Sequence, residues 1–294
     1  MRQLRHLREP PSVARVAAKL VPLEEASDLV PDGARVAMGG LMMGGAPLSF
    51  CRELIKAGRR DLDLIVMTGG MNVDWLLAAG CVRRLSTAIV SFEGFGLAPN
   101  FRRAAEAGAV TIEDWSELTM LCALRAKISG VPFMPTRAGL GTDVPVNLPE
   151  RMWEMTDERS GRAFVAVAPL EPEFAVVHVH EADELGNARV LPKLTWIDGE
   201  LVKAAARTIV TAERIVPTET FREAPERTTL PAYAVDHVVH APRGAWPVAM
   251  RPDYDYDAEF HRRYTRAAAD PAEFRRLFEE AVAPFPHGPP EWLR

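Results

Sequence analysis

The sequence predicts an α/β fold, with a mostly parallel sheet covered by helices on both faces. Short apolar runs alternate with helical segments of about ten residues, the pattern of strands joined by crossover helices. A second observation is a glycine-rich loop that follows the first predicted strand and precedes a helix. Because such folds bind ligands at the carboxyl ends of their strands, this loop is the first candidate for a functional site.

The individual elements follow from where the apolar periodicity starts and stops. Strands or β-rich segments are expected at 35–38, 63–67, 86–91, 162–169, 174–180, 208–212 and 236–240. Helices are expected at 48–57, 72–79, 100–107, 116–129, 200–206 and 257–282, with Ser116 as an N-cap. The segment 131–149 holds four prolines and two glycines, so it is expected to be a long loop without helix.

The organisation into domains is expected to be simple. Residues 21–290 contain no internal repeat and no low-complexity linker, which predicts one α/β domain or two tightly joined lobes. Residues 1–20 are basic, and we expect them to form a loosely ordered N-terminal arm. Their apolar stretch is too short and too interrupted for a secretory signal.

Charge and cysteine content limit the classes of partner. The chain has 294 residues with 35 basic and 40 acidic side chains, and it lacks the basic run that binds nucleic acid. It also lacks an uninterrupted apolar stretch of about 20 residues, so we expect neither a nucleic acid nor a membrane partner. Cys51, Cys81 and Cys122 form no CxxC pair, which predicts buried thiols in a reducing, cytoplasmic compartment.

The glycine-rich loop lies within 30–47, VPDGARVAMGGLMMGGAP. It lacks the Gly-Lys-Ser/Thr of a P-loop and the G-x-G-x-x-G spacing of a dinucleotide site. Two interpretations remain. The glycine pairs either make a tight connection between strand and helix or form a backbone wall that a ligand approaches closely.

Other polar residues are weaker candidates. Glu117 falls in the first turn of a helix that follows a strand, where it either stabilises the helix dipole or serves a site. Arg137 suits either an anionic substrate or a salt bridge that anchors its loop. His178 and His180 alternate on one strand without a third ligand at a recognisable spacing, so no metal site is expected. The absence of a G-x-S-x-G elbow argues against a serine hydrolase.

Aromatic residues gather near the C-terminal end of the sequence, at alternating or near-helical spacing. They are Tyr254, Tyr256, Phe260 and Tyr264. Such a cluster indicates either a surface for a partner protein or part of the core.

Five segments, read in order, resemble the A (α) subunit of glutaconate-type family I coenzyme A transferases. They are VPDGARVAMGGLMMGGAP, VPFMPTRAGLGTD, ARTIVTAERIV, VDHVVHAPRGAWP and PDYDYD. The resemblance implies a CoA-transferase-like subunit that pairs with a similarly folded B (β) subunit, expected as a heterotetramer with the active site between the subunits. An acyl-CoA thioester and a carboxylic acid would be the substrates, with no permanently bound cofactor.

The resemblance also implies roles for individual residues. The wall of the acyl and CoA cleft would be shaped by Gly39, Gly40, Gly44, Gly45, Pro47, Arg137, Gly139 and Gly141. Backbone N–H groups of the glycine loop would stabilise an oxyanion there. In the transferases the nucleophilic glutamate belongs to the B subunit, within a Ser-Glu-Asn-Gly motif. The segment of this sequence most similar to that motif is Ser91-Phe92-Glu93-Gly94, which has a different spacing. This chain alone is therefore not expected to be a competent transferase.

Glu117 departs from the transferase pattern. It stands where the transferases carry a neutral amide, and it matches the A subunit of a related heterodimer that opens a ring of a sterol-derived acyl-CoA by hydrolysis. In that relative the glutamate acts as a general base, which would make Glu117 catalytic here. The leading hypothesis is the A subunit of a heteromeric CoA transferase. The alternatives are a hydrolase subunit that cleaves a carbon–carbon bond and a non-enzymatic acyl-CoA-binding sensor.

Overall fold

The computed structural model describes residues 18–191 and 196–293. The arm expected at 1–20 therefore lies almost entirely outside the described residues. The last part of that segment lies against the sheet, because the Lys19 N–H donates to Glu184 O at 2.7 Å and Leu20 forms a bridge with Val238.

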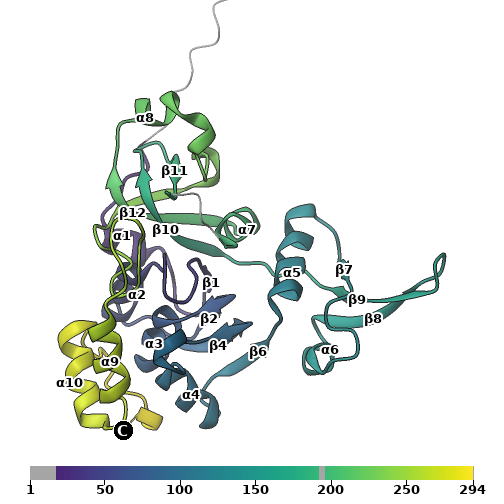
Figure 1. Ribbon diagram of the computed structural model, residues 1–294, viewed down its shortest axis with the longest axis horizontal. Coiled ribbons are helices and arrows are strands. Elements are labelled where there is room, and N and C mark those ends of the chain that lie inside the picture. The colour runs from purple at the N-terminus through teal and green to yellow at the C-terminus, as the bar shows by residue number, and fades with distance from the viewer. Residues whose placement is uncertain (1–17, 192–195, 294) are drawn as a thin grey trace, which may run out of the picture.

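An eight-stranded sheet forms the centre of the molecule (Figure 1). Its strand order is β13-β12-β10-β1-β2-β4-β6, with β11 paired to β10, and every pair except β10–β11 is parallel. The strands are β1 (Arg35–Met38), β2 (Leu62–Ile65), β4 (Val82–Thr87), β6 (Thr111–Asp114), β10 (Phe174–Ala182), β11 (Ala188–Arg189), β12 (Arg207–Ile215) and β13 (His237–His240).

The chain builds this sheet outward from β1 in both directions. It first adds β2, β4 and β6 on one side of β1, and later adds β10, β12 and β13 on the other. The topological switch point therefore lies between β1 and β10, where Val36 pairs with Phe174. In open α/β sheets this is the place where ligands bind, beyond the carboxyl ends of the strands.

Helices cover both faces of the sheet, as the sequence predicts. Successive side chains of a strand point to opposite faces, and Val36 and Met38 of β1 join one buried cluster whereas Ala37 joins a second. The first cluster is covered by α1 (Leu23–Asp28), α2 (Leu48–Lys56), α3 (Met71–Ala78) and α4 (Pro99–Glu106), and the second by α5 (Glu117–Ser129) and α7 (Asp198–Ala204).

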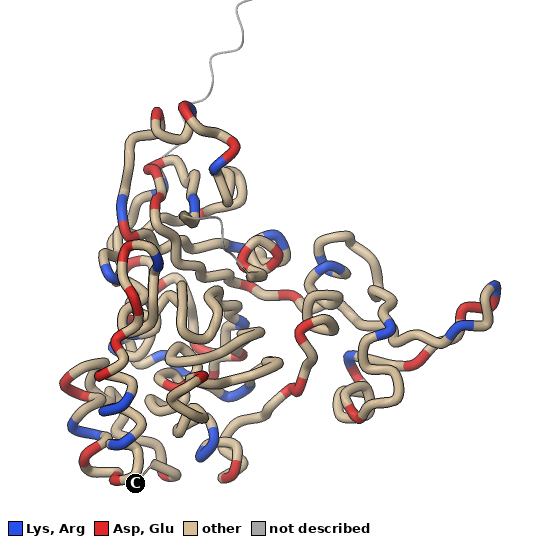
Figure 2. Tube along the Cα trace, in the orientation of Figure 1, with Lys and Arg blue, Asp and Glu red and all other residues tan. Residues whose placement is uncertain are grey.

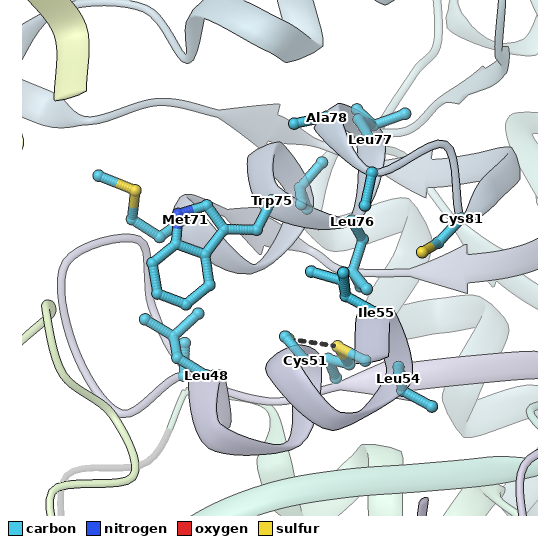
Figure 3. Close-up of a cluster of buried hydrophobic side chains, with 14 of the residues drawn as sticks. Leu48, Cys51, Leu54, Ile55, Met71, Trp75, Leu76, Leu77, Ala78 and Cys81 are labelled. Atoms are coloured by element: carbon cyan, nitrogen blue, oxygen red, sulfur yellow. Dashed lines mark hydrogen bonds between the residues drawn. The ribbon is translucent and has the colours of Figure 1, made fainter. Parts of the chain in front are cut away.

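Figure 3 shows the part of the first cluster that lies between α2 and α3. Leu48, Cys51 and Ile55 recur at helical spacing on α2 and meet Trp75 and Leu76 of α3. All five side chains are fully buried, so they fix the helix that follows the glycine loop against the sheet. The three cysteines are buried and unbridged, as predicted.

A small antiparallel sheet projects from the body at one side (Figure 1). It consists of β7 (Met134–Thr136), β9 (Arg162–Val167) and β8 (Met152–Asp157), with the one-turn helix α6 (Val144–Asn147) beside β8. The hairpin between β8 and β9 ends in a charged tip (Figure 2). The expectation that 131–149 holds no helix was wrong, because Pro145 occupies the first turn of α6, where its missing N–H removes no hydrogen bond.

The C-terminal region forms two helices, α9 (Ala258–Ala267) and α10 (Pro271–Ala281). The expected single helix over 257–282 was wrong, because Asp270 caps a new helix, its Oδ1 accepting the Ala272 N–H at 2.8 Å, and Pro271 occupies the first helical position. Phe260 and Tyr264 on α9 are buried in the first core cluster. These two aromatic residues therefore belong to the core and not to a partner surface.

Shorter elements complete the described chain. They are β3 (Thr68–Gly69) and β5 (Ile89–Val90), which pair in parallel, α8 (Thr218–Glu223), and 3-10 turns η1 (Glu93–Phe95), η2 (Pro225–Arg227), η3 (Ala232–Ala234) and η4 (Glu291–Leu293). The expected strand 86–91 is thus divided between β4 and β5. In the described part of the chain, no helix has the length and apolar character needed to cross a membrane.

Candidate active site

The glycine loop leaves β1 at the switch point and forms a tight backbone turn. Leu41 N–H donates to Gly44 O at 2.8 Å, and Gly44 N–H returns a hydrogen bond to Leu41 O at 2.9 Å. Gly40 has a φ of +95°, and a Cβ at this position would lie 2.7 Å from the Ala46 backbone. Gly40 is therefore required by the close approach of the two ends of the loop.

The N–H groups of all four loop glycines have acceptors within the chain. Gly39 donates to Val176 O, Gly40 to Asp198 Oδ1, Gly44 to Leu41 O and Gly45 to Ala249 O, at distances from 2.8 to 3.0 Å. Within 39–45, the N–H that has no hydrogen-bond acceptor among the described residues is that of Met43. The glycines thus set the shape of the loop, and its unpaired donor is Met43.

Asp198 is a site residue that the sequence analysis missed. It begins α7, and its Oδ1 accepts the Gly40 N–H at 3.0 Å. A Cβ added at Gly39 would lie 1.8 Å from the same oxygen, so the carboxyl group occupies the space that the glycine leaves. Burial raises the pKa of Asp198, and the backbone N–H groups of Gly40, Asp198 and Trp196 act in the opposite direction. No spacing pattern links positions 158 residues apart, so the sequence held no signal for this contact.

The segment 243–250 supports the other side of the glycine loop. Ala249 accepts the Gly45 N–H at 2.8 Å and donates to Met43 O at 2.8 Å, and Gly244 O accepts the Ser49 N–H at 2.8 Å. These bonds connect the segment to the second half of the loop and to the start of α2.

Glu213 on β12 anchors this segment to the sheet. Its carboxylate accepts the Arg243 N–H at 2.5 Å, the Tyr254 hydroxyl, and His178 Nε2 at 2.9 Å. Burial acts to raise the pKa of Glu213, but these hydrogen bonds and the proximity of His178 outweigh it, so the pKa is lowered. Burial, together with the adjacent Glu213, raises the pKa of Tyr254.

The histidines on β10 are occupied by hydrogen bonds. His178 contacts Thr211 Oγ1 at 2.8 Å in addition to Glu213, and His180 contacts Arg251 O at 2.9 Å and the Leu191 N–H at 3.0 Å. Both act as structural residues. Within 18–191 and 196–293, no group of three or more candidate ligands has the arrangement of a metal site.

Glu117 lies at the same carboxyl edge of the sheet, at the start of α5. Ser116 caps this helix, with its Oγ accepting the Thr119 N–H at 3.1 Å, which confirms the predicted N-cap. The Glu117 side chain is exposed and has no hydrogen bond or ion pair with the described residues. A carboxylate at this helix end is stabilised by the dipole and stays available to a ligand or partner.

The loop 137–141 follows β7, which packs against α5. β7 runs back beside α5, with Thr136 in contact with Cys122, so the loop after β7 continues toward the end of α5 that carries Glu117. Gly139 and Gly141 have φ values of +88° and +70°, and Arg137 is exposed. The strand order separates this group from the glycine loop by three strands, or about 14 Å. The predicted residues therefore form two clusters on one edge.

A cleft of about 630 Å³ adjoins the outer end of the glycine loop. It is lined by Met43, Glu93, Gly94, Phe95, Tyr256, Arg262, Thr265 and Arg266. Glu93 has a φ of +50°, an unusual conformation for a residue with a side chain. The guanidinium groups of Arg262 and Arg266 give the cleft positive charge, which suits an anionic group, and Glu93 offsets part of this charge.

These features place the protein in a defined class. The profile of the coenzyme A transferase family matches residues 22–241, so the chain belongs to this family and the predicted resemblance is confirmed.

The relatives fall into more than one reaction class. An uncharacterised protein of Archaeoglobus fulgidus is 35% identical over 91% of this chain, and the chain spans 60% of its length. The A-type chain of a 3-oxoadipate CoA-transferase from Pseudomonas knackmussii is 31% identical over 90% of this chain and 94% of its own. The IpdA subunit of a cholesterol ring-cleaving hydrolase from Mycobacterium tuberculosis is 29% identical over 85% and 88%. The last two are named as subunits, which implies a partner chain for each.

Solved structures show the same range. Glutaconate coenzyme A-transferase from Acidaminococcus fermentans matches with a TM-score of 0.84 at 27% identity, covering 90% of this chain and 89% of that one. A single-residue variant of the decarboxylase AibA/AibB matches with a TM-score of 0.81 at 32% identity, covering 90% and 98%. The same fold thus carries several reactions, and site residues must distinguish them.

Proposed function

We propose that this chain is the A subunit of a heteromeric CoA transferase, which moves CoA between an acyl-CoA and a carboxylic acid. The observation that carries the proposal is the carboxyl edge of the sheet, where candidate site residues are exposed. The glycine loop is covered by α7 and the segment 243–250, whereas Leu41 in that loop and Glu117 and Leu118 at the start of α5 are exposed along this edge. Such an edge is half of a site that a B-type subunit completes.

The nucleophile of this reaction belongs to the partner. Its glutamate carboxylate attacks the acyl-CoA carbonyl carbon, which gives a mixed anhydride and releases CoA thiolate. The thiolate then attacks the glutamyl carbonyl, which releases the acyl group as a carboxylate and leaves a glutamyl-CoA thioester. The second carboxylic acid reverses both steps and takes the CoA.

This chain contributes the shape of the cleft and a backbone donor. Each attack on a carbonyl carbon places negative charge on its oxygen, and a positioned N–H stabilises that charge by about 3 kcal/mol. The unpaired Met43 N–H supplies the donor, and the glycines hold it in place. Arg137, Gly139 and Gly141 are assigned to the acyl side of the cleft, beside Glu117.

A second candidate function is acyl-CoA hydrolysis with carbon–carbon bond cleavage. The observation that favours it is Glu117, whose exposed carboxylate is unpaired in the described chain and suits a general base. In this reaction Glu117 removes a proton from water, and the resulting hydroxide adds to a ketone carbonyl carbon of the substrate. Collapse of this adduct to a carboxylic acid breaks the adjacent carbon–carbon bond, and the leaving carbon, a carbanion stabilised by a neighbouring carbonyl group, takes up the proton from Glu117. The 29% identical hydrolase relative supports this alternative.

We infer that the assembly is a cytoplasmic heterotetramer of two A-type and two B-type chains. Buried, unbridged cysteines are in keeping with a reducing compartment. Native mass spectrometry of the co-expressed chains tests the stoichiometry.

The deciding experiment uses the chain co-expressed with the product of its neighbouring gene. The purified pair is incubated with acetyl-CoA and either 3-oxoadipate or glutaconate, trapped with hydroxylamine, and examined by mass spectrometry. Transfer chemistry modifies one glutamate of the partner, and Glu117→Gln retains the CoA exchange. Glu106→Gln, an exposed glutamate of α4, serves as the matched control.

Other outcomes select the alternatives. An unmodified pair that consumes acyl-CoA and stops with Glu117→Gln makes this chain the catalytic half of a hydrolase. Binding of acyl-CoA without turnover would instead indicate a sensor.

A further inference from the structure

The carboxyl group of Asp198 is enclosed by the glycine loop at the switch point. Its Oδ1 accepts the Gly40 N–H at 3.0 Å and lies where a side chain on Gly39 would begin. This position is over the carboxyl end of β1, since Gly39 directly follows that strand. The absence of a side chain at Gly39 is therefore explained by an interaction within the chain, without any ligand.

The contact joins the start of α7 to the glycine loop, in addition to the packing of α7 on the sheet. Gly39 and Gly40 extend β1, whereas Asp198 begins α7, which packs on the opposite face of the sheet from α2. A change in the position of α7 is transmitted through this carboxyl group to the glycine turn. Leu41 and Gly44, which follow Gly40 in the chain, close the turn by two mutual hydrogen bonds, and Thr68 and Ala249 hold the turn from the other side.

The contact also decides which donor the loop offers. The Gly40 N–H already donates to a carboxyl oxygen of Asp198, and the other three glycine N–H groups donate to backbone carbonyls. The unpaired donor is the N–H of Met43, which lies between Leu41 and Gly44 in the turn and lines the adjoining cleft.

We propose that Asp198 is a positioning residue for the thioester site: seated in the space left by Gly39, its carboxyl group holds Gly40 and thereby fixes the Met43 N–H. This inference rests on the proposed function for the identity of the ligand, but the restraint on the loop is a property of the chain itself. Asp198 acts through the loop and does not contact the substrate.

The test is a double-mutant cycle in the co-expressed complex, using Gly39→Ala, Asp198→Ala and both together. Gly39→Ala alone forces the carboxyl group away, and we expect melting temperature and kcat to fall. In the Asp198→Ala background the overlap with the carboxyl group is gone and the remaining close neighbour is Val177 Cγ1 at 3.0 Å, so the same substitution has a smaller effect. Matched controls are Gly199→Ala, where a Cβ meets no atom within 4 Å, and Glu200→Ala, which removes an acid from the same turn.

Hydrogen exchange measures the restraint without any substrate. Asp198→Ala should accelerate exchange of the peptide 39–45 by about tenfold, the size expected when one buried hydrogen bond is lost. Exchange of the peptide 71–78 should not change. With acetyl-CoA as the probe, kcat should fall by about tenfold with KM within about threefold, because the loop is displaced and binding contacts remain. Asp198→Asn, which keeps an acceptor for Gly40, should recover most of both effects.

The outcomes separate this inference from the proposed function. If wild-type complex transfers no CoA to any acid, the proposed function fails, and the exchange and melting data still decide whether Asp198 holds the loop. Unchanged exchange in Asp198→Ala, or equal effects of Gly39→Ala in both backgrounds, would overturn the inference. A loosened loop with unchanged kcat would overturn it as well.

Discussion

Asp74 shows how a single buried carboxylate organises several elements. Its Oδ1 accepts the N–H groups of Asn100 at 2.8 Å and Phe101 at 2.9 Å, so α3 caps the start of α4. Its Oδ2 accepts Asn100 Nδ2 at 2.7 Å and the Tyr264 hydroxyl at 2.8 Å, which attaches α9 to the same point. Burial raises the pKa of Asp74, and these hydrogen bonds act against the rise.

This arrangement predicts that removing one hydrogen-bond donor to Asp74 lowers the free energy of unfolding by an amount that depends on pH. Tyr264→Phe should lower the free energy of unfolding by about 1–3 kcal/mol, because a buried carboxylate loses a partner. Since the native pKa of Asp74 lies above its unfolded value of about 3.9, the folded state binds the proton more tightly, and stability falls as pH rises between the two values. Loss of the hydroxyl raises the native pKa further, so urea unfolding should show a larger deficit at pH 8 than at pH 5.

The matched control is Tyr233→Phe, because Tyr233 is 91% exposed. It should change stability by less than about 0.5 kcal/mol at either pH. An equal deficit for Tyr264→Phe at both pH values would contradict the assignment of the effect to Asp74.

At the scale of elements, the glycine loop is held from two sides, by α7 and by the segment 243–250. Glu213 connects that segment to β12, and its lowered pKa means that it contributes stability above its unfolded value of about 4.3. This contribution is lost as pH falls through the native pKa.

Glu213→Ala is therefore expected to loosen the segment and the loop together. It leaves the Arg243 N–H and the Tyr254 hydroxyl without their acceptor, at a cost of about 1–3 kcal/mol for each donor that stays buried. Hydrogen exchange should rise in both 243–250 and 39–45. Glu219→Ala on the exposed helix α8 is the control, and a rise confined to 243–250 would refute the connection to the loop.

The elements also show what the sequence could and could not predict. Alternating strands and helices are encoded by local periodicity, so both helical layers and the position of the glycine loop were predicted. The division of 257–282 was missed because an apolar stripe continues across Asp270 and Pro271, although Asp followed by Pro is a helix-start signal. Asp198 and Glu213 were missed for a different reason. Their partners are set by strand order, which brings distant segments together without any local pattern.

At the scale of the whole molecule, the carboxyl edge of the sheet differs from an ordinary surface. The exposed apolar residues are Leu41 after β1, Ile89 in β5, Leu118 in the first turn of α5 and Trp196 before α7, and each is between 39% and 49% exposed. Isolated exposed leucines are common, but a row of them beside an unpaired carboxylate indicates a protein interface. The proposed B-type subunit would cover this row.

Substitutions on one helix can test this interface. Leu118, 49% exposed, lies in the first turn of α5, and Ile128, 39% exposed, lies at its other end, about 15 Å away. Leu118→Glu should weaken association with the partner by about 30-fold or more, because it removes the burial of a leucine and places a charge in the contact. Ile128→Glu should leave association unchanged. Sedimentation of the co-expressed chains measures both, and the far-ultraviolet circular dichroism of each variant confirms that α5 is still formed. If both variants dissociate the complex equally, the contact runs along the whole helix. If Leu118→Glu does not dissociate it, the carboxyl edge is not part of the interface, and the argument that this edge is half of an active site fails.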